Sequence, residues 1–126
     1  MLLPDLVNGV GMFNGCRVTQ LPANMVLDNL SISGTGNSNG AMFQGCPLTD
    51  LPIGMTLKGL TRGTNMFLSS NINTARYSKL LQDLDNLNPN LNVSLHAGSS
   101  KYNSSASVSR SNLIAKGYTL TDGGLA

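Results

Sequence analysis

Apolar positions recur along the first half of the chain and predict a repeated unit. MFNGCRVTQLPANMVLDNL begins at Met12 and MFQGCPLTDLPIGMTLKGL begins at Met42, so two copies of one pattern lie 30 residues apart. Apolar residues are kept between the copies, while many polar ones change. A third copy opens at Met66, only 24 residues after the second, and a shortened copy precedes the first. Such self-similarity predicts stacked units that share one continuous core.

Short strands are predicted inside each copy, because RVTQL (residues 17–21) and PLTDL (residues 47–51) alternate apolar and polar side chains. Stacking would place these strands in a parallel ladder, about 4.8 Å apart. Pro22 and Pro52 lack a backbone donor and are expected to end them. The Gly-rich links NGVG, GTGNSNG and RGTN are predicted turns.

The aromatic and thiol residues of the copies occupy matching positions. Phe13, Phe43 and Phe67 are expected to stack inside the core. Cys16 and Cys46 hold equivalent inward sites, which predicts buried, reduced thiols, with a disulfide as the less favoured alternative. Nothing near them supplies the closely spaced ligand set that a metal needs, so no metal site is expected.

The repeat stops after Asn73, and a different order of elements follows: helix, strand, helix, strand. The first helix is predicted to begin near Thr74, as its cap, and to end at Asn88–Pro89. Its apolar residues lie at helical spacing: Tyr77, Leu80, Leu81, Leu84 and Leu87.

Two strands and a second helix complete the chain in this interpretation. LNVSLHAG (91–98) alternates and predicts a strand. SSASVSRSNLIAKG (104–117) predicts a helix that starts near Ser104 or Ser105 and stops at Gly117. YTLT (118–121) predicts the last strand. A stack of repeats needs a closed end, so residues 76–126 are interpreted as a cap on a repeat segment at 1–75.

Composition limits the possible functions. The chain has 126 residues, enough for one domain, with 40% apolar residues but only 5% aromatic ones. A net charge of +2 without a basic block does not indicate a nucleic-acid partner. No run approaches the roughly 18 apolar residues of a membrane span, so no membrane insertion is expected. The start, MLLPDLVNG, lacks the regions of a signal peptide.

Catalytic chemistry finds little support in the residues. His96 is the sole histidine and lies near no recognisable nucleophile motif. Asp83 and Asp85 are two apart on a predicted helix, so they point in different directions and do not form a glycosidase pair. The sequence therefore predicts a protein that is not an enzyme and needs no cofactor.

Two charged residues near the end allow more than one role. Asp122 precedes Gly123–Gly124, where its carboxylate is expected to cap backbone amides in a tight turn, with calcium or ligand binding as the alternative. Arg110 is expected to have a structural role, pairing with a carboxylate or lying across the cap, with an anionic sugar as the alternative partner.

Polar residues of successive copies are expected to form a small binding ledge. GTGNSNG resembles no phosphate loop, because no G-K-[ST] follows, and it is equally well an idle insertion or a recognition loop. Amide and hydroxyl groups suit hydroxyl-rich sugars. The predicted binding residues are Thr19, Gln20, Ser33, Asn37, Asn39, Thr49 and Asp50.

The pattern F-x-x-C-x-x-L-x-x-L-P, followed by another M/A-F, resembles the leucine-rich repeats of bacterial surface proteins of the BspA-like class, over residues 3–73. This resemblance implies an α/β fold: a short leucine-rich-repeat-like solenoid with parallel short strands, capped by a helix-strand-helix-strand segment. The six-residue insertion in the first copy departs from the pattern and is expected to loop out of the stack.

The ending, YSKLL…NVSLHAGSSKYNSSASVSRSNLIAKGYTLTDGG, is similar to the closing segment of many bacteriophage tail-fibre and tailspike proteins and of related bacterial repeat proteins. The residues that carry this similarity are Tyr77, Ser78, Leu80, Leu81, Tyr102, Ala106, Arg110, Leu113, Gly117, Tyr118, Thr119, Asp122, Gly123 and Gly124.

Together the two resemblances imply the carboxy-terminal region of a longer fibre protein, located in the virion at a fibre or tailspike tip. The implied function is non-enzymatic recognition of a bacterial host surface, through a polysaccharide or an outer-membrane receptor, by a homotrimer. One alternative is a bacterial cell-surface adhesion protein. Another is a structural terminus for fibre folding and trimerisation.

Overall fold

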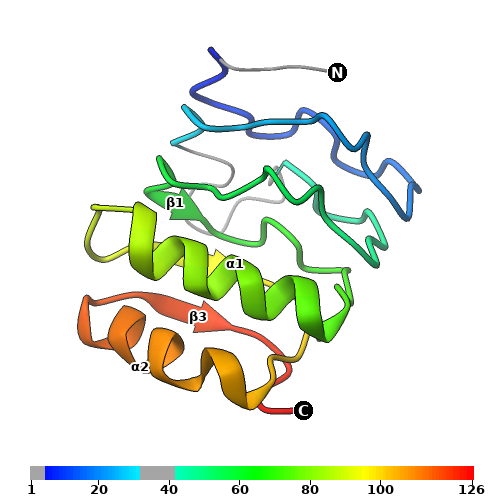
Figure 1. Cartoon of the computed structure of the whole chain (residues 1–126). Helices are drawn as coiled ribbons and strands as arrows, with labels where there is room; N and C mark the ends of the chain where they lie inside the picture. Colours follow the sequence, from blue (N-terminus) through cyan, green and yellow to red (C-terminus); the bar gives the residue numbers. More distant parts are fainter. Residues whose placement is uncertain (1–4, 32–41) are drawn as a thin grey trace.

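Successive levels of the chain lie one above another from the N-terminus to the C-terminus (Figure 1). The computed structural model describes residues 5–31 and 42–126. The elements are β1 (Arg62–Gly63), α1 (Thr74–Leu87), β2 (Ser94–His96), the 3₁₀ turn η1 (Ser104–Ala106), α2 (Ser107–Ala115) and β3 (Thr119–Thr121). The three strands form one parallel sheet in the order β1-β2-β3. The prediction of an α/β fold with short parallel strands is therefore confirmed.

The first two copies of the repeat fold in the same way locally. Matching turn hydrogen bonds occur in both, from the backbone N–H of Cys16 to Phe13 O, of Cys46 to Phe43 O, of Met25 to Pro22 O and of Met55 to Pro52 O. Gly15 and Gly45 have positive φ angles of 79° and 82°, which suit a residue without a Cβ. The shared sequence pattern thus encodes a shared series of turns.

The three phenylalanines form a continuous stack through these levels. Ring centroids are 5.5 Å apart between Phe13 and Phe43 and 5.6 Å apart between Phe43 and Phe67, with nearly parallel planes. Phe43 and Phe67 are fully buried, and Phe13 is partly buried. The predicted aromatic stack is confirmed.

The predicted strands at residues 17–21 and 47–51 do not form. Between these segments the backbone bond from Thr49 N to Thr19 O measures 2.9 Å. A ladder runs elsewhere: Ser31 N donates to Val7 O, and Thr61 N donates to Ser31 O, both at 2.8 Å. In the second copy Leu48 and Leu51 are buried while Pro47 and Thr49 are exposed, so side chains can alternate in an irregular segment that forms no strand.

The strand β1 covers Arg62–Gly63, the first half of the RGTN segment that the sequence predicts as a turn, and Thr64–Asn65 form the turn. Gly63 pairs with Leu95 of β2, and a Cβ at Gly63 would lie 2.9 Å from Ser94 O. The glycine is therefore needed for the close approach of two backbones, and not for a change of chain direction.

Helix α1 begins at Thr74, one residue earlier than predicted, because the sequence predicts Thr74 as the cap that precedes the helix. The side chain of Asn73 caps the helix by accepting a hydrogen bond of 2.9 Å from Arg76 N, and Thr74 is the first helical residue. The helix ends at Asn88, as predicted. The apolar face packs into the core, except for Leu87, which is 50% exposed.

Two polar side chains of α1's segment satisfy the irregular backbone of the second copy. Arg76 is buried and donates from Nε to Leu51 O at 3.1 Å. Asn88 Nδ2 donates to Leu57 O at 3.0 Å and to Leu60 O at 2.9 Å. Buried carbonyls need donors, and a chain of turns does not supply them all. The segment of α1 therefore completes the hydrogen bonding of the second copy, which precedes it in the chain.

The last two elements agree with the predicted order. Asn103 caps the turn η1, whose residues lead directly into α2, and Gly117 ends the helix with a φ of 87°. In Figure 1, α1 and α2 lie side by side. The sheet crosses the predicted boundary at residue 75, because β1 lies before it and β2 and β3 after it.

The two cysteines differ, against the prediction. Both are free thiols; Cys46 is buried, whereas Cys16 is exposed. Cys46 Sγ donates to Phe13 O of the preceding copy at 3.1 Å. Cys16 holds the same place in its own copy, but among the described residues no earlier copy covers it as the first copy covers Cys46.

Candidate functional site

The structure brings together the predicted threonines of the binding ledge. Thr49 donates to Thr19 O from its backbone N at 2.9 Å and from its hydroxyl at 3.3 Å. Both residues are exposed, and together they form a polar edge across two copies. The predicted positions Ser33, Asn37 and Asn39 lie outside the described residues.

Gln20 and Asp50, the other predicted pair, line one cavity of about 470 Å³. Its remaining walls are mainly apolar: Leu21, Ala23, Leu51, Pro52 and Ile53. Asp50 Oδ1 accepts a 2.8 Å hydrogen bond from Leu51 N, which fixes the carboxylate at the cavity wall. Equivalent positions of successive copies thus meet at one hollow.

A second hollow of about 340 Å³ continues past Asp50 and Ile53 towards the start of α1. Its further lining residues are Asn73, Ala75, Arg76 and Lys79. We call the two hollows together the Asp50 groove. Asn73 and Arg76 are fixed there because they cap α1 and bind the second copy's carbonyls.

The charges along the Asp50 groove are nearly balanced. Burial lowers the pKa of Arg76, and the carboxylates of Asp83 and Asp50 act in the opposite direction. Lys79 forms a 2.6 Å ion pair with Asp83, one turn further along α1. The groove therefore offers an amide, a carboxylate and an ammonium group around an apolar wall, of which Ile53 is 65% exposed.

The groups that line the groove can bind a ligand through hydrogen bonds and apolar contact. Asp50 is the single carboxylate among the residues that line the groove, and hydrolysis of a glycoside needs two. Among the described residues, no group of three or more His, Cys, Asp or Glu side chains is placed to hold a metal ion. A polar ligand with an apolar face fits the groove.

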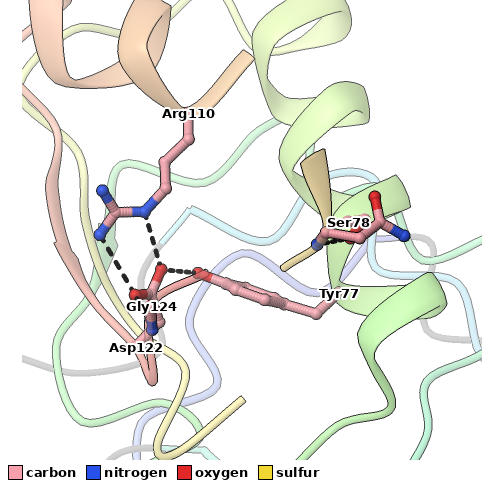
Figure 2. Close-up of polar contacts among 6 residues, drawn as sticks. Tyr77, Ser78, Arg110, Asp122 and Gly124 are labelled. Atoms are coloured by element: carbon pink, nitrogen blue, oxygen red, sulfur yellow. Dashed lines mark hydrogen bonds and ion pairs between the residues drawn. The ribbon is translucent and has the colours of Figure 1, made fainter. Parts of the chain in front are cut away.

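The carboxylate of Asp122 is occupied by a buried network at the C-terminal end (Figure 2). Asp122 Oδ2 accepts from Tyr77 Oη at 2.6 Å and from Arg110 Nε at 3.0 Å. Oδ1 accepts from Gly124 N at 3.0 Å and from Arg110 Nη2 at 3.2 Å. The turn-capping prediction for Asp122 and the ion-pair prediction for Arg110 are confirmed.

Tyr77 is the member of this network that the sequence did not assign. Burial and the hydrogen bond to Asp122 raise the pKa of Tyr77 far above its ordinary value, so the phenol stays a donor. Arg110 also lies over the ring of Tyr102, 5.1 Å from its centroid. The network ties the last turn to α1 and α2, and leaves Asp122 no free lone pair for calcium.

His96 occupies an outward position on β2. Its Nδ1 accepts a hydrogen bond of 3.1 Å from Gly98 N, and burial lowers the pKa of the imidazole. Its partner in register on β3 is Thr121. That His96 does not act together with a catalytic nucleophile, as in a hydrolase, stays a prediction.

Several groove residues escaped the sequence analysis. Asn73 is the last residue of the predicted repeat, and Arg76 and Lys79 come from the beginning of α1, so nothing local ties them to Gln20 or Asp50. The position of Arg76 four residues before Leu80, on the apolar helix face, was a signal for a structural cation. The contact itself depends on how the helix packs on the second copy.

Comparison with protein-family models, with curated proteins and with solved structures finds no match for this chain. Within residues 5–31 and 42–126, no helix has both the length and the apolar character needed to cross a bilayer.

Proposed function

We propose that this chain is a non-enzymatic binding module that recognises surface glycans through the Asp50 groove. The observation that carries the proposal is the meeting of Gln20 and Asp50, equivalent residues of successive copies, in one hollow with a largely apolar wall. Sugars present hydroxyl groups at their edges and C–H groups on their faces. Amide and carboxylate groups beside Leu21 and Ile53 complement both.

The finer fold proposal is a short leucine-rich-type solenoid with a cap at residues 76–126. The repeated turns, the phenylalanine stack and the ladder from Val7 through Ser31 to Thr61 support it. In such a solenoid, equivalent residues line up on one surface, which explains how a repeat can build a binding groove.

The biological setting follows from the resemblance of the ending to phage fibre tips. The chain is the host-recognition end of a bacteriophage tail fibre or tailspike, with a bacterial surface polysaccharide or outer-membrane receptor as ligand. A bacterial adhesion protein is the alternative setting for the same groove. Each neutral hydrogen bond contributes only about 0.5–1.5 kcal/mol, so one groove binds weakly. A homotrimer gains avidity through effective concentration.

The test replaces two groove side chains and compares cell-surface binding. Gln20→Ala removes an exposed amide, and Asp50→Asn removes the charge while keeping the oxygen that accepts from Leu51 N. Asp28→Asn is the matched control, because Asp28 is an aspartate of the first copy paired with Lys58 at 3.7 Å, outside the groove. Binding by the assembled fibre should fall at least several-fold in the double variant and stay unchanged in the control. Undiminished binding by a folded double variant would contradict the proposal.

A second candidate function is that of a structural terminus that assists trimer formation. The specific observation behind it is the apolar surface of the first copy, where Val7, Met12 and Val18 are 54%, 47% and 43% exposed. Exposed apolar groups at one end favour packing against a further polypeptide surface. The mass of the protein in solution tests this candidate, since Met12→Gln should convert a trimer to monomers while leaving the core unchanged.

A further inference from the structure

The outward face of the three-stranded sheet carries a third hollow, which shares no lining residue with the Asp50 groove. Along β2, Ser94 and His96 point outward and Leu95 points into the core. The register places Ser94 beside Thr119 and His96 beside Thr121 of β3. Outward side chains of neighbouring strands thus form a small array, as the pleat requires.

This hollow has a volume of about 170 Å³, and hydroxyl, amide and imidazole groups lie in it beside an apolar surface. Its lining residues are Thr64, Asn65, Ser94, Leu95, His96, Thr119 and Thr121. We call it the hydroxyl hollow. No carboxylate, ammonium or guanidinium group is among these residues, so the set is neutral apart from the imidazole.

His96 is oriented by the backbone so that one nitrogen is left for a ligand. Because Gly98 N donates to Nδ1, the neutral imidazole carries its proton on Nε2. Burial lowers the pKa of His96, which favours this neutral form at pH 7. The ring therefore offers a fixed N–H donor beside the hydroxyl groups.

Two of the hydroxyl groups are hydrogen-bonded to each other. Thr64 Oγ1 and Ser94 Oγ are 3.0 Å apart, so one donates to the other and their remaining capacity is available to a ligand. Thr119 and Thr121 are exposed on the neighbouring strand. Hydroxyls both donate and accept, and this matches adjacent hydroxyls of a sugar, which do the same.

The other ligand classes fit the hollow less well. Calcium needs several oxygen ligands with carboxylates among them, and zinc needs further imidazole or thiolate ligands, whereas one histidine and no carboxylate or cysteine line the hollow. An anion is favoured by a cationic side chain in the lining, which is also missing there. A flat apolar ligand would leave the hydroxyls and the imidazole N–H without partners.

We propose that the hydroxyl hollow binds a neutral pyranose through two neighbouring hydroxyl groups, with His96 Nε2–H as one donor. The hollow is a second sugar site that does not depend on the Asp50 groove. If both sites are occupied, the molecule contacts a glycan-covered surface in two places. Such weak sites together bind a polysaccharide better than either alone.

The test is a titration of the full chain with methyl glycosides of glucose, galactose and mannose, followed by NMR. Chemical shifts should move at Thr119, Thr121 and His96, with a dissociation constant in the millimolar range that a few neutral hydrogen bonds give. Sodium sulfate and methyl glucuronide serve as anionic probes. Binding of sulfate alone would show an anion site and would overturn the proposal, as would no shift with any neutral glycoside.

Matched variants separate the ligand contact from the fold. His96→Asn keeps an oxygen that can accept from Gly98 N and removes the Nε2 donor, so binding should weaken roughly threefold to tenfold. His96→Gln keeps a distal donor and should bind closer to the parent. Thr119→Val and Thr121→Val remove exposed hydroxyls while keeping side-chain shape, and each should weaken binding several-fold. Parent-like affinity in His96→Asn and in the double valine variant would overturn the proposal.

Failure of this site is distinguishable from failure of the Asp50 groove. Gln20→Ala with Asp50→Asn should leave the shifts at Thr119, Thr121 and His96 unchanged. Conversely, the double valine variant should leave any shifts at Gln20 and Ile53 unchanged. Shifts at the groove residues alone would support the groove and reject the hydroxyl hollow.

Discussion

The two ends of this molecule treat their apolar residues in opposite ways. At the N-terminal end, the first copy exposes Met12 and Val18, whose counterparts Met42 and Leu48 in the second copy are fully buried. At the C-terminal end, α1 and α2 cover the last levels, and the side chain of Asp122 is 2% exposed at the centre of a hydrogen-bond network. One end presents core-type apolar residues to the surface, and the other is closed by helices and polar contacts, with Val108 and Ile114 exposed on the outer side of α2.

The comparison teaches that burial is set by position in the stack and not by the local sequence. Phe13 and Phe43 have nearly the same neighbours in sequence, yet one is partly and the other fully buried. Cys16 and Cys46 differ in the same way. A unit with two neighbouring levels buries both faces, and a unit with one neighbour buries one.

The largest expected effect comes from removing the closed end. A chain ending at Asn73 loses α1, α2 and two strands, which uncovers Phe67 and leaves the edge of β1 unpaired. We expect aggregation and loss of cooperative unfolding, because an exposed strand edge and apolar face pair with other chains. Size-exclusion chromatography and thermal melting check this. A soluble monomer with a sharp melt would show that the closed end is dispensable.

Truncating the central aromatic ring should be the most costly single change. Phe43→Ala removes a fully buried ring with a stacked partner on each side, so the free energy of unfolding should fall by about 3–5 kcal/mol. Phe13→Ala, with one partner, should cost about 1–2 kcal/mol. Chemical denaturation of both variants measures the difference. Equal costs would break the comparison between the two copies.

The polar closure of the C-terminal end is tested by Asp122→Asn. The change replaces the charged carboxylate that accepts hydrogen bonds from Tyr77 and Arg110 by a neutral amide. The free energy of unfolding should fall by about 1.5–3 kcal/mol, since hydrogen bonds to charged groups are stronger than neutral ones. Asp83→Asn is the control, because its pair with Lys79 lies near the surface and should contribute less than about 1 kcal/mol. Urea denaturation distinguishes them. A cost no larger than that of the control would show that the network does not close this end.

Thiol labelling sharpens the contrast between the copies. Cys16 should react at once with a thiol reagent in the folded protein. Burial, with a smaller contribution from the nearby Cys16 thiol, raises the pKa of Cys46, and the side chain is inaccessible. We expect Cys46 to react slower by on the order of a hundredfold or more, since it needs local opening. Mass spectrometry of timed samples assigns each thiol, and similar rates would contradict the structure.

The smallest effect concerns His96 and pH. Its folded pKa lies below the ordinary value of 6.5, so the unfolded chain takes up the proton first as the pH falls. The stability contribution is complete above about pH 6.5 and is lost as the pH falls through the depressed folded pKa. The loss should be less than about 1 kcal/mol. His96→Asn should lack it, which denaturation at pH 7 and near pH 5.5 measures. A folded NMR titration midpoint above 6.5 would reverse the sign.

Much of the local order could be predicted because its signals are local. The helical spacing of Leu80, Leu81 and Leu84 gave α1, and the stop at Gly117 gave the end of α2. The predicted strands at 17–21 and 47–51 failed, because side chains can alternate between inward and outward positions in an irregular segment without ladder pairing. The turn predicted at RGTN forms only at Thr64–Asn65, because glycine serves both turns and close backbone contacts and Gly63 lies in β1.

The candidate groove was only half predictable. Gln20 and Asp50 could be paired because the copies have the same register, and equivalent residues of stacked units become neighbours. Asn73, Arg76 and Lys79 could not be added, since they join through the packing of α1 on carbonyls of the second copy. Side chains that bind a distant backbone leave no pattern of their own in the sequence.

The sequence by itself determined the period of the repeat, the phenylalanine stack, the two helices and the chemical nature of the side chains at each level. These follow from spacing and turn chemistry, which act over a few residues. Only the tertiary structure decided which copy is covered and where the parallel strands pair. It also decided which side chains meet at the Asp50 groove and at the hydroxyl hollow. Those outcomes depend on contacts between levels, where a backbone finds its hydrogen-bond partners some 30 residues away, as Thr49 does with Thr19.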